Sequence, residues 1–230
     1  MATVYTRRED MPERYRVTLE QMMKSQAYRE LFAARLFGHG LQFVEENRWL
    51  KFIVWHIREE TEHYFAVAEM YERFTGESIE TWVRERLLQN PIPFAASWFE
   101  LAMAQFLYDR GGFWQLQEYE VCSYPPYREV IGKIIGEERG HQTLGERIVV
   151  ELCQSRRYET VKQPLFERWL RLGLLSFGRP ETEGSHYAIE VGLKKRDARA
   201  VMRDFLADIQ PAVDAAGLAV PPLSSLGIES

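Results

Sequence analysis

The sequence predicts an all-α protein in which four long helices form a bundle and further helices follow. From about residue 12 to residue 122 the apolar residues recur at spacings of three and four, the period of a helix, and no long alternating strand pattern competes. The chain has 230 residues, 46% of them hydrophobic, which suffices for one sizeable core. We therefore expect one domain over residues 1–230, with a core bundle at about 13–154 and C-terminal helices at about 159–216.

The first half of the bundle is expected to be a pair of long helices. The periodicity predicts one helix at about 13–45 and a second at about 48–75, which ends at Thr75-Gly76. A short helix at about 78–88 follows. The segment Asn90-Pro91-Ile92-Pro93 then forbids a continuous helix, because proline lacks a backbone donor and restricts the residue before it.

The second half of the bundle is expected to be another pair of long helices. One is predicted at about 94–121 and the other at about 127–154. The segment Ser123-Tyr124-Pro125-Pro126-Tyr127 turns the chain between them.

Further helices are expected after the bundle. One at about 159–176 carries an apolar load suited to packing against the bundle, and Gly178-Arg179-Pro180 ends it. Residues 181–185 are expected to form a polar loop, and a final helix is expected at about 193–216. The tail that contains Pro221-Pro222 is expected to be loosely held.

Charge and cysteine content narrow the classes of function. The 34 acidic residues outnumber the 29 basic ones, which gives a formal charge of −5 and argues against a nucleic-acid-binding surface. Only Cys122 and Cys153 are present, which excludes a disulfide scaffold and a Cys-rich zinc or iron–sulfur module. Oxygen and nitrogen atoms would therefore have to bind any metal.

The sequence also predicts a cytoplasmic protein that does not enter a membrane. Residues 1–15 contain no apolar segment behind their charges, as a secretory signal would. Charged or strongly polar residues interrupt every hydrophobic stretch before it reaches the roughly 18 residues that span a bilayer.

The pattern Glu-x-x-His occurs once on each of two predicted long helices. The two copies are Glu60-Thr61-Glu62-His63 and Glu138-Arg139-Gly140-His141, and positions three residues apart share a helix face. A single copy is most simply a solvated helix face. Both copies, however, lie in otherwise apolar stripes, where a carboxylate or an imidazole is costly to bury unless it pairs or binds a metal. The two motifs together predict a metal centre inside the bundle.

Two further acids are expected to complete this centre. In ferritin-like di-metal proteins two helices each supply Glu-x-x-His, and the other two each supply one carboxylate. Glu30 and Asp109 are the acids in the apolar stripes of the first and third long helices, 30 and 29 residues before Glu60 and Glu138. The competing acids are expected to be solvated or at the rim, although one on the third helix stays open as the ligand instead of Asp109: Glu20, Glu45, Glu46, Glu100, Glu118 and Glu120.

The charge of the expected ligands fits a pair of metal ions. Four carboxylates bring −4 and two divalent cations bring +4, so the filled site is neutral in a medium where net charge is costly. Carboxylate and imidazole ligands suit iron, with manganese as the alternative, whereas a tetrahedral zinc ion needs fewer ligands. We expect a ferritin-like four-helix bundle with two iron ions held by Glu30, Glu60, His63, Asp109, Glu138 and His141.

Several neighbours of these residues have two possible roles. His39 and His56 are either hydrogen-bond donors to the ligands or ordinary, partly buried histidines. Glu59, Glu62 and Glu137 adjoin ligands but point off the ligand face. One of these acids could orient a ligating imidazole, while a solvated role is favoured for Glu62.

Six segments carry a resemblance to a known family, in that family's order and with closely similar spacing. They are Tyr15-Arg16-Val17-Thr18-Leu19 leading to Glu30, Glu59-Glu60-Thr61-Glu62-His63, Phe106-Leu107-Tyr108-Asp109, Ser123-Tyr124-Pro125-Pro126-Tyr127, Glu137-Glu138-Arg139-Gly140-His141-Gln142 and Ser176-Phe177-Gly178-Arg179-Pro180. Over roughly residues 12–222 the sequence resembles the phenylacetic acid catabolic proteins, specifically the catalytic α subunit of ring-1,2-phenylacetyl-CoA epoxidase. The resemblance favours Asp109 among the acids of the third helix, because the family's ligand there is an aspartate at this spacing.

The resemblance implies a non-haem di-iron oxygenase that activates dioxygen and inserts one oxygen atom into the aromatic ring of a CoA thioester. It implies electrons from a separate flavin and iron–sulfur reductase, and a catalytically silent sister subunit beside the active one. Because all six candidate ligands are present, the chain looks like the active type. One iron would be held by Glu30, Glu60 and His63, and the other by Asp109, Glu138 and His141, with Glu60 and Glu138 as bridges.

Two departures from the family leave alternatives open. The family has Asp where Glu59 stands, and its α subunit continues well beyond residue 230. A different aromatic or acyl-CoA type substrate, or a homodimer in place of the sister subunit, is therefore an alternative. Two other classes remain: a ferritin-like iron-oxidising or peroxide-scavenging protein without an organic substrate, and a non-catalytic scaffold subunit, against which the six metal-binding side chains argue.

Overall fold

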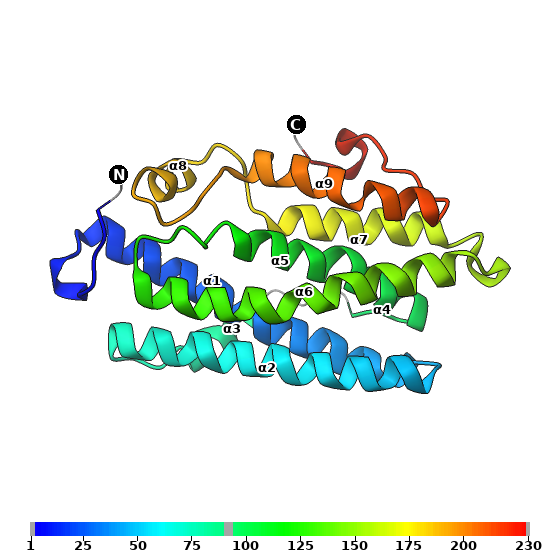
Figure 1. Cartoon of the computed structure of the whole chain (residues 1–230), viewed down its shortest axis with the longest axis horizontal. Helices are drawn as coiled ribbons and strands as arrows, with labels where there is room; N and C mark the ends of the chain where they lie inside the picture. The colour runs from blue at the N-terminus through cyan, green and yellow to red at the C-terminus, as the bar shows by residue number, and fades with distance from the viewer. Residues whose placement is uncertain (1–2, 90–93, 229–230) are drawn as a thin grey trace.

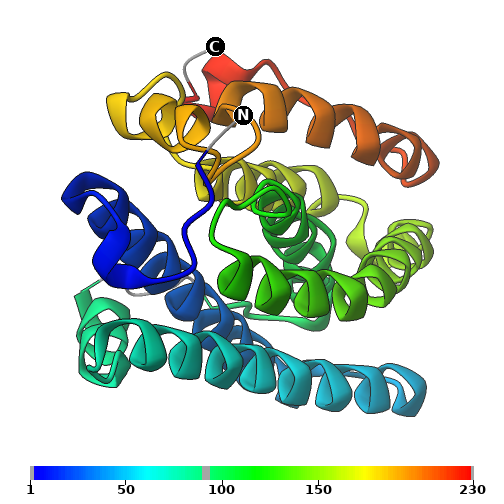
Figure 2. The same cartoon turned by 60° about the vertical axis from the view of Figure 1, so that its left-hand side comes forward.

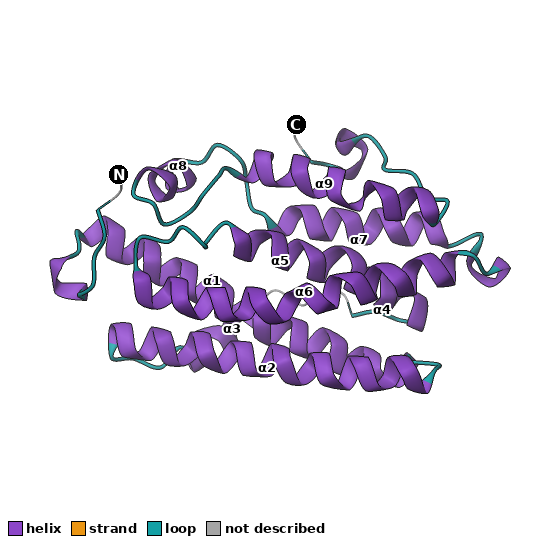
Figure 3. Ribbon diagram, in the orientation of Figure 1, coloured by secondary structure: helices purple, strands orange, loops and turns teal. Residues whose placement is uncertain are grey.

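The computed structural model describes residues 3–89 and 94–228, and in these ranges every regular element is helical (Figures 1 and 3). The all-α class is confirmed, while the predicted break at 90–93 lies outside the described residues. None of the helices in these ranges has the length and apolar character needed to cross a bilayer. The bundle consists of α1 (Glu13–Gly40), α2 (Asn47–Thr75), α4 (Trp98–Ala104), a π-helical segment (Gln105–Asp109), α5 (Arg110–Gln117) and α6 (Pro125–Cys153). The other helices are α3 (Glu80–Gln89), α7 (Lys162–Ser176), α8 (Glu183–Glu190) and α9 (Ala198–Ala215), with short 3-10 turns at Arg8–Asp10, Leu41–Phe43, Arg156–Tyr158 and Leu223–Leu226.

The long helices are stacked in layers. In Figures 1 and 2, α1 and α2 form one hairpin, and the second hairpin, made of α4, the π-helical segment, α5 and α6, packs against it. The helices α7 and α9 cover the outer side of the second hairpin. This is the ferritin-like four-helix bundle with additional C-terminal helices that the sequence predicts.

Helix boundaries in the bundle follow local chemistry. The helix α2 ends where the sequence predicts, because Gly76 adopts a left-handed conformation with φ of 79° and its N–H donates to the Glu72 carbonyl at 2.8 Å. The helix α6 begins at Pro125, slightly earlier than predicted, because proline is well suited to the first turn of a helix.

The third long helix differs from the continuous α-helix predicted at 94–121. It begins only at Trp98, because the Ser97 hydroxyl accepts a hydrogen bond from the Glu100 N–H at 3.1 Å and so caps the helix. Between Gln105 and Asp109 the backbone is π-helical, and the regular α-helix then resumes and ends at Gln117. Such wide turns alter the direction of the side chains they carry and are frequent at functional sites. In this protein the wide turn carries Asp109.

Two glycines bring neighbouring helices close to the π-helical segment. A Cβ atom on Gly145 of α6 would lie 2.9 Å from Cγ of Gln105, and a Cβ atom on Gly173 of α7 would lie 2.8 Å from the carbonyl oxygen of Leu107. Real Cβ atoms do not approach other atoms so closely, so both contacts require glycine. The π-helical segment is thus held between α6 and α7.

The segment predicted as a polar loop at 181–185 is partly helical. The helix α8 starts inside it, because the Thr182 hydroxyl accepts a hydrogen bond from the Ser185 N–H at 3.1 Å. The final helix, α9, begins at Ala198, later than the predicted residue 193. Its cap is Asp197, whose carboxylate accepts the Arg199 N–H at 2.9 Å.

The tail after α9 is held more firmly than predicted. Leu226 and Ile228 are buried, and Arg171 of α7 donates a hydrogen bond to the Leu226 carbonyl at 2.9 Å. The prediction of a loosely held tail is therefore wrong, because apolar contacts and a long-range hydrogen bond fix the segment.

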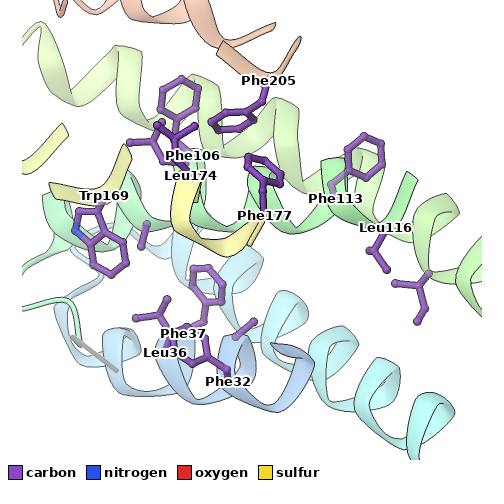
Figure 4. Close-up of a cluster of buried hydrophobic side chains, with 14 of the residues drawn as sticks. Phe32, Leu36, Phe37, Phe106, Phe113, Leu116, Trp169, Leu174, Phe177 and Phe205 are labelled. Atoms are coloured by element: carbon purple, nitrogen blue, oxygen red, sulfur yellow. The ribbon is translucent and has the colours of Figure 1, made fainter. Parts of the chain in front are cut away.

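The C-terminal helices contribute to the main hydrophobic core. Figure 4 shows Phe106, Leu174, Phe177 and Phe205 gathered where the second hairpin meets the C-terminal helices. The rings of Phe177 and Phe205 lie edge to face, with centroids 5.4 Å apart. On the opposite side of the close-up, Phe32, Leu36 and Phe37 project from α1. The apolar load predicted for the helix at about 159–176 is confirmed in large part, because Phe166, Trp169, Leu170 and Leu174 are buried, whereas Leu175 is exposed.

We predict that Gly173→Ala destabilises the protein by about 1–3 kcal/mol, because the added Cβ would displace backbone at Leu107. The matched control is Gly136→Ala on the exposed face of α6, where no described atom outside the local helix backbone and the two neighbouring residues lies within 4 Å of the new Cβ. There the higher helix propensity of alanine should raise stability by roughly 0.5–1 kcal/mol. Urea unfolding measures both changes, and an unchanged midpoint for Gly173→Ala would contradict the close contact.

Candidate metal centre

The six acidic and imidazole side chains selected from the sequence lie together in the middle of the bundle, and all six are buried. Together with His56 they form two groups of candidate metal ligands that share Glu60, and in each group the ligand atoms lie within 4.8 Å of one another. One group is Glu30, Glu60, His63 and Glu138, and the other is His56, Glu60, Asp109 and His141.

One ring nitrogen of His63 faces the carboxylates of the cluster, and the other hydrogen-bonds to a carboxylate outside it. Its Nε2 donates to Glu137 Oε2 at 2.8 Å. Its Nδ1 is buried and has no hydrogen-bond partner in the described part of the chain, while Glu138 Oε1 lies 3.3 Å away and Glu30 Oε2 lies 3.6 Å away. A lone pair that faces two carboxylates repels them unless a proton or a metal cation lies between. The side chains present therefore fit a divalent cation at this position.

His141 repeats the arrangement from the other hairpin. Its Nδ1 lies 3.1 Å from Glu138 Oε2, and its Nε2 lies 2.8 Å from Glu59 Oε2. The pairing is reciprocal, because Glu59 of α2 fixes a histidine of α6, whereas Glu137 of α6 fixes a histidine of α2. Imidazoles that bind metals commonly donate their outer N–H to a carboxylate in this way.

Of the three acids next to the motifs, two orient an imidazole and one is solvated. One orienting carboxylate was expected, and the structure has two, Glu59 and Glu137. Glu62 is exposed and pairs with Arg58 at 3.2 Å, so its solvated role is confirmed.

Two more residues contact the cluster: His56, which the sequence analysis left as either a hydrogen-bond donor or an ordinary histidine, and Gln105, which it did not select. His56 is completely buried, and its Nε2 lies 2.8 Å from Glu60 Oε1 and 3.2 Å from Asp109 Oδ1. Gln105 lies between His56 and Asp109 and hydrogen-bonds to both, at 2.7 Å each. A signal was present in the sequence, because each residue precedes a selected acid by four positions and so shares its helix face.

The electrostatics of the cluster favour added positive charge. Burial and the neighbouring carboxylates, foremost Glu138, raise the pKa of Glu60 well above its ordinary value of 4.5. Burial opposes the ionisation of Glu138, yet His141 and His63 lower the pKa of this carboxyl below its ordinary value. Burial alone would lower the pKa of His63, but the carboxylates of Glu138 and Glu30 raise it to about 12. Protons therefore supply positive charge when no metal is bound.

A small cavity of about 30 Å³ adjoins the cluster. Glu30, Glu60, Asp109 and Glu138 form its polar wall, and the rest of the lining comes from α1, the second hairpin and Ser176 of α7. The remaining lining residues are Gln26, Arg29, Ala33, Tyr108, Gly112, Phe113, Leu116 and Ser176. This volume holds about two water molecules, so dioxygen or peroxide fits, whereas an aromatic ring would have to displace side chains.

Two acids expected at the surface of the third long helix are buried instead. Glu100 pairs with Arg168 at 2.5 Å, and Glu118 pairs with Arg196 at 2.6 Å. The prediction was wrong because both arginines come from segments after the bundle that cover this helix. With these partners, neither acid competes with Asp109 for a place in the cluster.

Sequence comparison agrees with this geometry. The profile of the phenylacetic acid catabolic protein family matches residues 59–227. The chain belongs to this family. The match contains both Glu-x-x-His motifs and Asp109 and begins after Glu30, and it confirms the resemblance at the level of the family, without identifying the subunit. No curated protein matches the chain.

We predict that the metal-free form of this phenylacetic acid catabolic protein loses stability as the pH rises above about 6.5. Folding raises the pKa of His63 from 6.5 to about 12 and raises that of His56 in the same direction, so the folded state retains protons that the unfolded chain releases. Their contribution is complete below pH 6.5 and declines as the pH rises towards the folded pKa. Urea unfolding of chelator-treated protein should give a lower midpoint at about pH 9 than at about pH 6.

We also predict that a divalent cation stabilises the folded protein, because it replaces those protons. Anaerobic Fe²⁺, or Mn²⁺, at about 100 times its Kd should add about 2.7 kcal/mol, which is roughly 5–10 °C in Tm for a chain of this size. Thermal unfolding with and without a chelator measures the shift. A Tm that no divalent cation alters would instead indicate a buried ion-pair network without a metal.

Proposed function

We propose that this protein is a non-haem di-iron oxygenase that uses dioxygen to oxygenate an aromatic or CoA-thioester substrate. The observation that carries the proposal is the convergence of four buried carboxylates with two histidines whose Nδ1 atoms face them. Membership of the phenylacetic acid catabolic protein family supports the same assignment. One iron would be held by Glu30, Glu60 and His63 and the other by Asp109, Glu138 and His141, with Glu60 and Glu138 between them.

The chemistry of the clustered donors supports iron, with manganese as the alternative. The donors are carboxylate oxygens and imidazole nitrogens, which suit these ions. Two divalent cations would neutralise the four carboxylates, which repel one another in a buried site. A reduced iron pair bound there would supply the electrons and the open coordination positions that dioxygen activation requires.

The protein's own residues would position these ions and control what reaches them. Glu137 and Glu59 hold the imidazoles of His63 and His141 in their ring orientations. Ala33 and Phe113 form part of the apolar wall of the cavity and limit the access of water to the cluster. Electrons would come from a separate reductase, and a sister subunit or a second copy of the chain would complete the assembly.

The proposed reaction is tested by one turnover with isotopically labelled oxygen. Protein loaded with iron and reduced under anaerobic conditions is mixed with ¹⁸O₂ and a set of aryl-CoA thioesters, and the products are analysed by mass spectrometry. We expect one ¹⁸O atom in an organic product. Oxidation of the iron with no labelled organic product, for any substrate and reductase, would contradict the proposal.

A second candidate function is supported by the size of the cavity. A space of about 30 Å³ admits dioxygen or peroxide but no aromatic ring without movement of side chains. A ferritin-like iron-oxidising or peroxide-scavenging protein needs nothing larger. Rapid oxidation of iron without an organic substrate, together with assembly into a multimeric shell, would favour this alternative.

We predict that Glu137→Ala weakens binding of Fe²⁺ or Mn²⁺ by about 10- to 100-fold, because His63 loses the carboxylate that fixes its ring. The matched control is Glu62→Ala, which removes an exposed acid of α2 that pairs with Arg58. This control should leave the affinity unchanged. Anaerobic titration calorimetry measures both, and equal affinities in the two variants would show that Glu137 has no role in holding the ion.

A further inference from the structure

We propose that His56 is a third histidine ligand, bound through Nε2 to the ion that Asp109 and His141 hold. This inference rests on the proposed function, since it assigns one more ligand to the same pair of ions. His56 precedes Glu60 by one helical turn on α2, and its side chain is completely buried against the cluster.

The distances around His56 fit a shared ion. Its Nε2 lies 2.8 Å from Glu60 Oε1 and 3.2 Å from Asp109 Oδ1. Two donor atoms bound about 2.1 Å from one ion, at a right angle to each other, lie about 3 Å apart. The candidate ligand atoms of His56, Glu60, Asp109 and His141 all lie within 4.8 Å of one another, so these four side chains could surround one ion.

The hydrogen bonds of Gln105 determine which ring nitrogen of His56 is available. The amide nitrogen of Gln105 donates to Asp109 Oδ2 at 2.7 Å, which leaves the amide oxygen to accept from His56 Nδ1, also at 2.7 Å. The reverse orientation would place the amide oxygen against a carboxylate oxygen. His56 therefore carries a hydrogen on Nδ1, and the lone pair of the neutral ring lies on Nε2, directed at Glu60 and Asp109.

Packing holds both the ring and the amide in place. The His56 ring lies among the rings of Phe37, Phe52 and His141, with centroids 4.3, 5.7 and 4.0 Å away. Gly145 of α6 lies directly over Gln105, and a Cβ there would come within 2.9 Å of Gln105 Cγ. The donor is thus oriented before any ion arrives, as a ligand should be.

With His56 as a ligand, the two ion positions are unequal. The position beside Glu30 would have one imidazole, His63, whereas the position beside Asp109 would have two, His141 and His56. The outer nitrogens of His63 and His141 face carboxylates, but that of His56 faces a neutral amide. The position with two nitrogen ligands should bind the later divalent metals of the first transition row more tightly, so the ions should bind in two separate steps.

The first test counts imidazole ligands in the unaltered protein. The full chain is freed of metal and titrated anaerobically with Co²⁺, with the bound metal measured by elemental analysis and the ligands by X-ray absorption. We expect two ions and three imidazoles per chain. Two ions with only two imidazoles would overturn the assignment of His56 and leave the proposed function intact, while fewer than two ions would overturn both.

The second test compares histidine variants. His56→Gln keeps a polar side chain but removes the imidazole, so we expect the affinity of one of the two ions to fall by at least about tenfold and the visible absorption of bound Co²⁺ to change. The control is His186→Gln, an exposed position on α8, which should alter neither. Unchanged affinities and an unchanged spectrum in His56→Gln would show that His56 only donates hydrogen bonds to Glu60 and Asp109.

Discussion

The mutual repulsion of four buried carboxylates is the constraint on which this structure depends. Glu30, Glu60, Asp109 and Glu138 come from all four long elements of the bundle and meet in its interior, with little exposure to solvent. Removed from solvent, such charges are costly and drive their helices apart unless positive charge lies between them. Protons on the imidazole rings supply part of that charge, and cations bound by the neutral rings would supply it instead. The helix contacts around the centre serve to keep these groups within a few ångströms of one another.

The helices after the bundle also contact the centre. Gly173 of α7 packs directly against the π-helical segment that carries Asp109. Ser176, at the end of the same helix, lines the cavity, and its carbonyl accepts a hydrogen bond from Arg29 of α1. This bond joins the C-terminal layer to the first hairpin across the second one. The geometry of the cluster therefore depends on residues more than 100 positions apart in the chain.

The sequence predicts those features that depend on local spacing. Helical periodicity gives the class and most helix boundaries. Two Glu-x-x-His motifs in apolar stripes select four of the residues that the structure brings together, and the acids Glu30 and Asp109 in the stripes of the other two helices complete the set of six. Features that depend on distant contacts are missed. The π-helical segment packs against Gly145 of α6 and Gly173 of α7, and the buried Glu100 and Glu118 pair with arginines from later segments. The sequence left two interpretations of His56. Helical spacing places it on the same face as Glu60, but it does not reveal the Gln105 amide that orients the ring.

The reciprocal pairing of Glu59 with His141 and of Glu137 with His63 has a consequence for the newly synthesised chain. Each ring is aligned by an acid from the opposite hairpin, so neither hairpin alone offers an aligned imidazole. A nascent chain that has released only its first hairpin from the ribosome lacks α6 altogether. Under the proposed assignment, an ion would therefore meet two aligned imidazoles only after translation has supplied both halves.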